Sequence, residues 1–212
     1  MSAIVTHNIE QYIAAHTSGE DKVLSALNRR THTDVMMPQM LSGQVQGQFL
    51  QMMTAILQPM RILEIGTFTG YTAICFAKHL PKDGLLYTIE VNKELEPIIS
   101  EYLQDAGVTD KVKLHFGNAL DIIPTLDEAF DLVFIDADKV NYSQYYDMVI
   151  DKVRHGGIIL ADNVLWSGKI VEDKKDKDTL ALDAFNKKIQ EDPRVSNVML
   201  SIRDGIMMIR KL

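Results

Sequence analysis

The 212-residue sequence is poor in cysteine, in tryptophan and in positive charge. Its one cysteine, Cys75, excludes an intrachain disulfide and any zinc site built from several thiolates. Its 22 Lys and Arg stand against 29 Asp and Glu, which gives a formal net charge of −7. A surface of that sign repels phosphate backbones, so we expect no nucleic acid as a partner.

Long hydrophobic runs are missing as well. No segment approaches the ~20 consecutive apolar residues that a membrane-spanning helix needs, so we expect no membrane association. Residues 1–20 contain no basic stretch followed by an apolar core, which predicts no signal peptide and, with the single cysteine, favours a cytoplasmic location. Because linkers, low-complexity tracts and internal repeats are also absent, residues 1–212 are expected to form one domain.

The sequence does contain clear periodic patterns, which divide it into two parts. In the first part, apolar residues recur at three- and four-residue spacing and predict helices over 4–16, 20–30 and 44–57, with a connection over 33–43. From residue 61 on, short segments that are apolar on both faces alternate with helical patterns, as in a doubly wound parallel sheet. The predicted strands are 61–65, 85–90, 112–116, 132–136 and 158–162, and the predicted helices between and after them are 70–80, 93–106, 118–127, 142–153 and 179–191.

The C-terminal end follows a different pattern. Two β-rich segments, 198–203 and 206–210, flank Asp204-Gly205, and Asp-Gly between such segments is a strong signal for a hairpin. The predicted fold class is therefore α/β, with a doubly wound, mostly parallel sheet of seven strands that ends in an antiparallel hairpin.

The turn after the first predicted strand carries the pattern E-x-G-x-x-x-G at residues 64–70. A dinucleotide site needs G-x-G-x-x-G, and here Thr67 and Phe68 stand where further glycines are required. Glu64 repels a pyrophosphate but accepts hydrogen bonds from an ammonium group. The turn therefore predicts a cationic ligand that carries an amino acid, such as S-adenosylmethionine. A plain βα turn with Glu64 in a surface ion pair is the alternative.

Two further strand ends support a nucleoside ligand. Glu90 ends the second predicted strand, where a carboxylate can accept both ribose hydroxyls. Gly117-Asn118-Ala119 follows the third strand and leaves room for a flat base. Glu90 alone is also compatible with a solvated strand end, but three such features at three consecutive strand ends rarely coincide by chance.

Acidic residues follow the next two predicted strands. Because the carboxyl ends of parallel strands meet at one edge of the sheet, Asp136, Asp162 and Asn163 are expected to converge beside the nucleoside pocket. Three oxygen donors without His or Cys suit Mg²⁺ or Ca²⁺. Lys139 is placed to help deprotonate a hydroxyl held there. The simpler alternatives are a helix N-cap for Asp136, an exposed ion pair for Asp138 and Lys139, and a plain turn after the fifth strand.

With these motifs in hand, the sequence resembles the cation-dependent class I O-methyltransferases, which include caffeoyl-CoA and, more distantly, catechol O-methyltransferases. The resemblance runs from about residue 36 to the C-terminus and rests on residues 47–50, 63–72, 134–142 and 160–168. It implies a Rossmann-like methyltransferase sheet and usually a homodimer. The helices of about residues 1–57 are expected to cover the active site.

The resemblance also implies roles for individual residues. Asp136, Asp162 and Asn163 match metal ligands, with Mg²⁺ expected and Ca²⁺ and Mn²⁺ as other candidates. Lys139 matches a lysine proposed as the base, so Lys139 and Asp136 are the predicted catalytic residues. Contacts with the cosubstrate S-adenosylmethionine are implied for Ser42, Glu64, Gly66, Thr67, Thr72, Glu90, Ala119, Asp136 and Asp138.

The predicted activity is methyl transfer to one of two vicinal hydroxyls of a small aromatic molecule. A free catechol is favoured, and a caffeoyl ester is the other candidate. Two alternatives stay open: a nicotinamide-dependent oxidoreductase, disfavoured by the missing glycine, and a non-catalytic nucleoside-binding protein. The resemblance also implies that the segment with Met36, Met37 and Met40 borders the cofactor and the acceptor, where a flexible cluster of methionines would suit several flat substrates. Core packing or a dimer contact is expected for Met52, Met53, Met207 and Met208.

Overall fold

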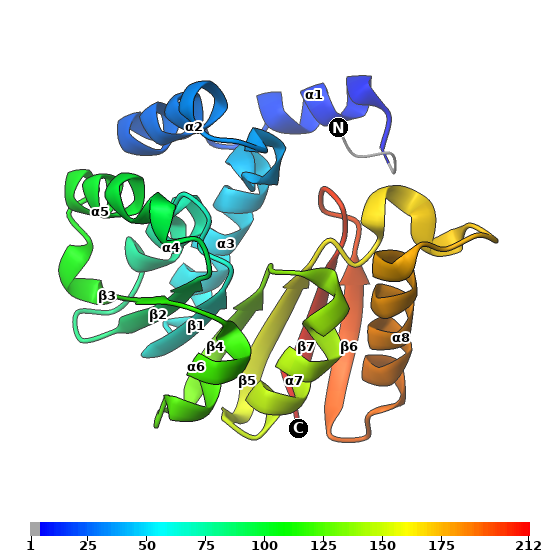
Figure 1. Ribbon diagram of the computed structural model, residues 1–212. Helices are drawn as coiled ribbons and strands as arrows, with labels where there is room; N and C mark the ends of the chain where they lie inside the picture. The colour runs from blue at the N-terminus through cyan, green and yellow to red at the C-terminus, as the bar shows by residue number, and fades with distance from the viewer. Residues whose placement is uncertain (1–4) are drawn as a thin grey trace.

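The structure is a computed structural model that describes residues 5–212, in which one seven-stranded sheet lies between two layers of helices (Figure 1). The strand order is β3-β2-β1-β4-β5-β7-β6. All neighbouring strands are parallel except for β7, which is antiparallel to both β5 and β6. This topology confirms the predicted fold class.

The first three strands have the predicted bounds, whereas the next two begin earlier than predicted. The sequence 153–157 contains two glycines that indicate a turn, but its first residue pairs with Phe130 across an irregularity in the ladder. Only the partner strand reveals this extension. The parallel strands are β1 (Arg61–Ile65), β2 (Leu85–Glu90), β3 (Val112–Phe116), β4 (Phe130–Ile135) and β5 (Val153–Asp162).

The C-terminal hairpin is confirmed, but its predicted two-residue turn is wrong. The strands are β6 (Val195–Leu200) and β7 (Ile206–Lys211), so five residues connect them. Within this β6–β7 loop Arg203 has a left-handed φ of 49°. A Cβ at Gly205 would lie 2.5 Å from the Leu165 side chain, so packing against Leu165 shapes the loop.

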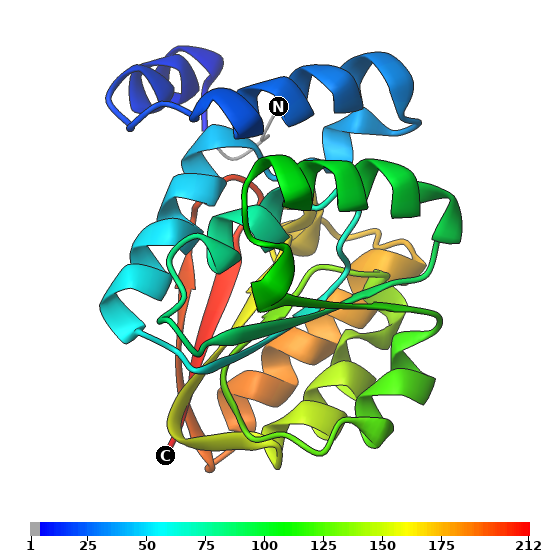
Figure 2. The ribbon, with the colours of Figure 1, turned by 90° about the vertical axis from the view of Figure 1, so that its left-hand side faces the viewer.

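Helices cover both faces of the sheet and bury a separate apolar cluster on each (Figure 2). One face is covered by α3 (Gly43–Leu57), α4 (Tyr71–Ala77) and α5 (Glu96–Asp105), and the other by α6 (Ala119–Ile122), α7 (Tyr142–Ile150) and α8 (Lys177–Glu191). Because successive strand residues point to opposite faces, Leu63 and Ile65 lie in the cluster under α7, and Ile62 lies in the other cluster. The short 3-10 helices are η1 (Pro38–Met40), η2 (Lys93–Leu95), η3 (Thr109–Lys111), η4 (Ile123–Thr125), η5 (Lys139–Asn141) and η6 (Trp166–Val171).

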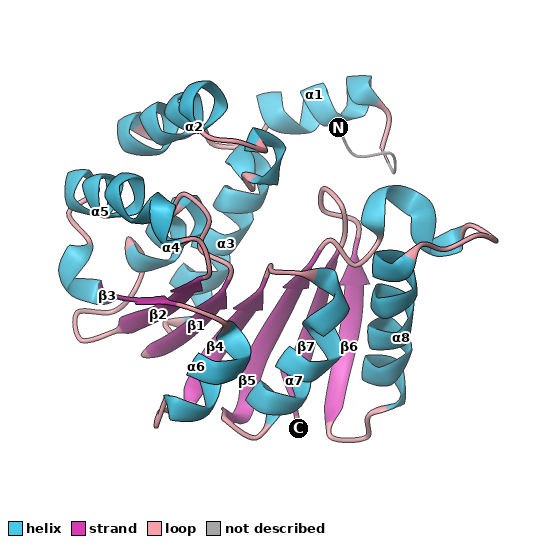
Figure 3. Ribbon diagram, in the orientation of Figure 1, coloured by secondary structure: helices cyan, strands magenta, loops and turns pink. Residues whose placement is uncertain are grey.

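Two N-terminal helices, α1 (His7–Ala15) and α2 (Lys22–Asp34), lie beyond the carboxyl ends of the strands (Figure 3). The start of the predicted helix 4–16 lies outside the described residues. Ion pairs of Arg30 with Glu101 and of the N-cap residue Asp21 with Lys78 join α2 to the rest of the molecule, whereas α1 buries none of its residues. Gln44 Nε2 holds the end of α1 by donating to the carbonyls of Ala14 and Thr17, at 3.1 and 3.0 Å. Within residues 5–212, no helix is long and apolar enough to cross a membrane.

Candidate active site

A cavity of about 1020 Å³ opens where β1, β2, β4 and β5 end. The sheet order reverses between β1 and β4, and ligands of doubly wound sheets bind at this point. The cavity is large enough for a nucleoside cofactor together with a small second ligand. The predicted site residues that line it are Ser42, Gly66, Thr67, Thr72, Glu90, Ala119, Asp136, Asp138, Lys139, Asp162 and Asn163.

The glycine turn closes tightly onto the end of the neighbouring strand. Gly66 has a φ of 102°, and a Cβ at this position would lie 1.9 Å from the carbonyl oxygen of Asp136. No other residue fits there without moving the backbone. The turn therefore brings the backbone of residues 66–70 directly beside the first acidic strand end.

Glu90 shapes this turn from the next strand. Its carboxylate accepts the N–H of Phe68 at 2.7 Å and the N–H of Asn92 at 2.8 Å. A carboxylate has about four lone-pair positions, so two remain for a ligand. The predicted contact between Glu90 and a ribose stays a prediction, and its place at the cavity wall agrees with it.

Glu64 differs from the other predicted residues because it does not line the cavity. It is fully buried beneath Thr72, and it accepts hydrogen bonds from the hydroxyls of Thr72 and Thr88. Burial raises the pKa of Glu64 to about 8, against the opposing effect of both hydroxyls. The alternative of a surface ion pair is therefore wrong, and a direct contact of Glu64 with the cofactor stays a prediction.

The residues after β4 and β5 converge on one point. Lys139 Nζ donates to Asp136 Oδ1 at 3.1 Å, to Asn163 Oδ1 at 2.8 Å and to the Tyr142 hydroxyl at 2.7 Å. Two of the three predicted metal ligands thus direct an oxygen at the same cation. Because Lys139 pairs with Asp136, the alternative of an exposed pair between Asp138 and Lys139 is wrong.

Asp162 completes this group from a buried position. Its Oδ1 accepts the N–H of Asn163 at 2.8 Å, and its Oδ2 accepts the side-chain N–H of Gln46 at 2.7 Å. Burial raises the pKa of Asp162 to about 7, and the charge of Asp136 acts in the same direction. Asp136 and Asp162 repel each other at this edge of the sheet, and a bound cation would reduce that repulsion.

The oxygen donors at this edge fit the metal that the sequence predicts only when an amide is included. Among residues 5–212, no three His, Cys, Asp or Glu side chains form a metal-binding group. The candidate site therefore needs Asn163 as its third oxygen donor beside Asp136 and Asp162. Two carboxylates and one amide oxygen suit Mg²⁺, which retains water or substrate oxygens in its remaining positions.

Asp138 is fixed in a different way from its neighbours. It accepts hydrogen bonds from the Tyr145 hydroxyl at 2.5 Å and from Asn141 Nδ2 at 2.6 Å. Helix α7 begins after Asn141, and Asp138 rather than Asp136 precedes η5, so the N-cap alternative for Asp136 is wrong.

Three residues at or next to the cavity were not predicted as site residues. Arg203 and Asp204 of the β6–β7 loop line the cavity, and Gln46 on α3 is buried behind the wall, where it is bonded to Asp162. The sequence predicts Arg203 only as the end of a strand and Asp204 only as a turn residue, because nothing local shows that the loop folds back onto β5. A polar residue on the apolar face of 44–57, directly before Gly47, was the available signal for Gln46.

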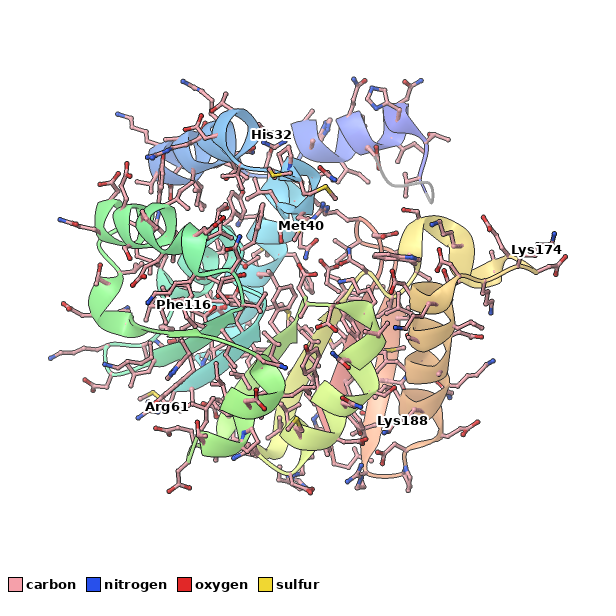
Figure 4. All side chains as sticks on the ribbon, in the orientation of Figure 1. His32, Met40, Arg61, Phe116, Lys174 and Lys188 are labelled. Carbon is pink, nitrogen blue, oxygen red and sulfur yellow. The ribbon has the colours of Figure 1, made fainter. Side chains whose placement is uncertain are left out.

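The methionine predictions have different outcomes: core packing is confirmed for Met207, and a contact of the segment 36–40 with cofactor or acceptor stays a prediction. Met37 and Met40 line the cavity, and Figure 4 shows Met40 beneath the two N-terminal helices, whereas Met36 is 86% exposed and is not part of the wall. Met207 is buried in the core. Met52 is 55% exposed, so core packing is wrong for this residue.

The strand order, the glycine turn after β1 and the acidic ends of β4 and β5 together define a Rossmann-like methyltransferase of class I. A family model described as O-methyltransferase matches residues 14–212. The chain therefore belongs to the O-methyltransferase family, and it is an S-adenosylmethionine-dependent enzyme. The recognised resemblance is confirmed, and neither an oxidoreductase nor a non-catalytic binding protein agrees with this family.

Curated relatives and solved structures agree with this assignment. Caffeoyl-CoA O-methyltransferase 1 of Eucalyptus globulus is 35% identical over 181 residues, which cover 79% of this chain and 73% of that protein. Catechol O-methyltransferase of Niastella koreensis is 34% identical over 177 residues, covering 82% and 80%.

Two crystal structures carry the cofactor or its product. The O-methyltransferase TomG from Streptomyces achromogenes, in complex with SAM, has a TM-score of 0.88 and 30% identity, with 96% of each chain covered. An O-methyltransferase from Bacillus cereus in complex with SAH has a TM-score of 0.89 and 28% identity, with 97% of each chain covered.

Proposed function

We propose that this enzyme transfers a methyl group to one of two vicinal hydroxyls of a small aromatic acceptor, with a divalent cation bound at Asp136, Asp162 and Asn163. The observation that carries the proposal is the convergence of Asp136 Oδ1 and Asn163 Oδ1 on one cationic group beside buried Asp162. Their position at the wall of the cofactor cavity supports it.

The residues of the site have distinct roles in this proposal. A Mg²⁺ held by Asp136, Asp162 and Asn163 would lower the pKa of a coordinated hydroxyl and so favour a nucleophilic oxygen near neutral pH. In its amine form, Lys139 takes the hydroxyl proton, and the methyl group passes from sulfur to oxygen. Trp166, Met37 and Met40 line the cavity, and in this proposal they offer the aromatic acceptor a flat and adaptable apolar wall.

The charges of the wall favour a free catechol over a coenzyme A ester. Glu10 of α1, Asp178 of α8 and Asp204 of the β6–β7 loop line the cavity, as does Arg203, which precedes Asp204 in that loop. Three carboxylates repel the phosphates of coenzyme A more than one guanidinium attracts them. A small neutral diol meets no such repulsion.

The decisive experiment assays catechols, caffeoyl-CoA and flavonoids with and without Mg²⁺, with the methylated positions resolved. Activity on free catechols that stops in excess chelator is expected. Turnover that is unaffected by chelator would contradict the metal role.

Asp136→Ala tests the site itself. We expect it to abolish metal binding and to lower turnover by at least about 100-fold, because one of three oxygen donors is lost, while the fold is kept. The control is Asp173→Ala on the exposed segment before α8, which is expected to have wild-type activity. Full turnover by Asp136→Ala would rule out the mechanism.

We also propose that the enzyme acts as a cytoplasmic homodimer, without nucleic acid or membrane partners. The net charge of −7 supports the first exclusion.

A further inference from the structure

Gln46 lies next to the candidate metal site, and both ends of its side chain are paired. The residue is fully buried on α3. Its Nε2 donates to Asp162 Oδ2 at 2.7 Å, and its Oε1 accepts from Arg203 Nη1 at 3.1 Å. These partners are 116 and 157 residues away along the chain, so the contact exists only in the folded molecule.

The chemistry of the two partners determines which way the Gln46 amide points. A guanidinium has no acceptor, so Arg203 must face the amide oxygen. An ionised carboxylate has no donor, so Asp162 must face the amide nitrogen. Glutamine is therefore matched to both partners at once, which a hydrocarbon or a carboxylate of the same length is not.

Both elements that carry this contact are firmly placed. Helix α3 packs closely on α4, since a Cβ at Gly47 would lie 2.8 Å from the ring of Tyr71. The β6–β7 loop is tied to the segment after β5, because Leu165 donates its N–H to the carbonyl of Asp204 at 3.0 Å. Arg203 holds a left-handed φ of 49°, and strain of this kind often accompanies functional sites.

We propose that Gln46 is a positioning residue, which holds the carboxylate of Asp162 in the orientation that binds a divalent cation. The inference rests on the proposed function, because it presupposes a cation at this site. Asn163 N–H fixes one oxygen of Asp162 and Gln46 fixes the other, so each oxygen keeps a lone pair for the cation. Donors behind a metal ligand commonly contribute about 10-fold to 100-fold in metal affinity.

The experiment titrates the chelator-stripped protein with Mn²⁺ by calorimetry. Gln46→Met keeps the length of the side chain and removes both hydrogen bonds. We expect its Kd for Mn²⁺ to rise about 10-fold. In the assay, the KM for the metal is expected to rise in parallel, while kcat at saturating metal stays within about twofold, because saturation compensates for weaker binding.

Gln51→Met is the matched control on the same helix. The Gln51 amide contacts Cys75 Sγ at 3.8 Å and His79 at 3.1 Å, away from the cavity wall. Its Kd for Mn²⁺ is expected to equal that of the wild type. SAH binding without metal reports whether each variant is folded, and it is expected to be unchanged in both.

The outcomes separate the two proposals. If the wild type binds Mn²⁺ and Gln46→Met binds it equally well, the positioning role is overturned and the metal site stands. If the wild type binds no divalent cation, the proposed metal dependence and the role of Gln46 are both contradicted.

A further measurement needs no variant: Mg²⁺ should shift the NMR signals of the Gln46 side-chain amide but not those of Gln51. If Mg²⁺ leaves the chemical shifts of the Gln46 side-chain amide unchanged, the proposal is overturned.

Discussion

At the scale of single residues, the surroundings of Glu64 decide its chemistry. The carboxyl lies in the second residue from the end of β1, so a sequence pattern places it near the ligand edge. In the structure it is buried on the face that α4 covers, and its hydrogen-bond partners are the hydroxyls of Thr72 and Thr88. Its pKa is raised to about 8 mainly because burial disfavours the charged form.

This raised pKa has a consequence for stability. Between about pH 4.5 and 8 the unfolded chain releases the Glu64 proton, whereas the folded protein retains it. The free energy of unfolding therefore decreases as the pH rises through this range. Glu64→Gln removes this titration and retains a group that can accept one hydroxyl and donate to another. Relative to wild type, the ligand-free variant is expected to gain stability from pH 5 to pH 8, by about a few kcal/mol at most.

Thermal unfolding of both proteins across this pH range checks the prediction. Glu94→Gln, at an exposed position, is the control and is expected to follow the wild-type profile. If the profiles of Glu64→Gln and wild type run parallel, Glu64 does not titrate in this range.

At the scale of elements, the βα turn and the β6–β7 loop build the site from opposite sides. The turn after β1 is shaped by the close approach of Gly66 to the end of β4. The loop is shaped by its contact with Leu165, and it brings Arg203 within hydrogen-bond distance of Gln46. The Asp-Gly pair predicts a hairpin from local sequence, but the five-residue length of the loop depends on its contact with Leu165.

Gly66→Ala tests the turn. The added Cβ would meet the carbonyl oxygen of Asp136 at 1.9 Å with a φ of 102°, so the turn must shift. We expect a loss of stability of about 2 kcal/mol or more and weaker binding of S-adenosylmethionine.

Gly19→Ala is the control, because a Cβ there meets no atom within 4 Å. Denaturant unfolding and a cofactor titration measure both effects. If Gly66→Ala unfolds and binds the cofactor like Gly19→Ala, the close approach is not a constraint in solution.

At the scale of the whole molecule, exposed apolar residues on α3 are compatible with the expected dimer. Met52 and Ile56 are 55% and 72% exposed on this helix. Of the two roles expected for Met52, a dimer contact therefore stays a prediction.

The segment between η6 and α8 is a charged surface loop. It carries acidic and basic residues, and Lys174 projects from the molecule there (Figure 4).

Light scattering after size-exclusion chromatography measures the assembly. We expect a mass of twice 23.9 kDa, with Met52→Lys shifted toward the monomer because a charge is placed in an apolar contact. Leu180→Lys, on α8 at the other face of the sheet, is expected to remain dimeric. A monomeric wild type would contradict the dimer.

The sequence alone determined the parallel strands 61–65, 85–90 and 112–116 and the residues at the strand ends, because apolar patterning and turn chemistry depend on near neighbours in the chain. The tertiary structure alone decided that Glu64 is buried, that β5 begins at Val153, and that Gln46 joins Asp162 to Arg203. Each of these features depends on contacts between segments that are far apart in the chain, and local sequence patterns do not predict such contacts. Burial, hydrogen-bond partners and pKa belong to the assembled site rather than to any one stretch of chain.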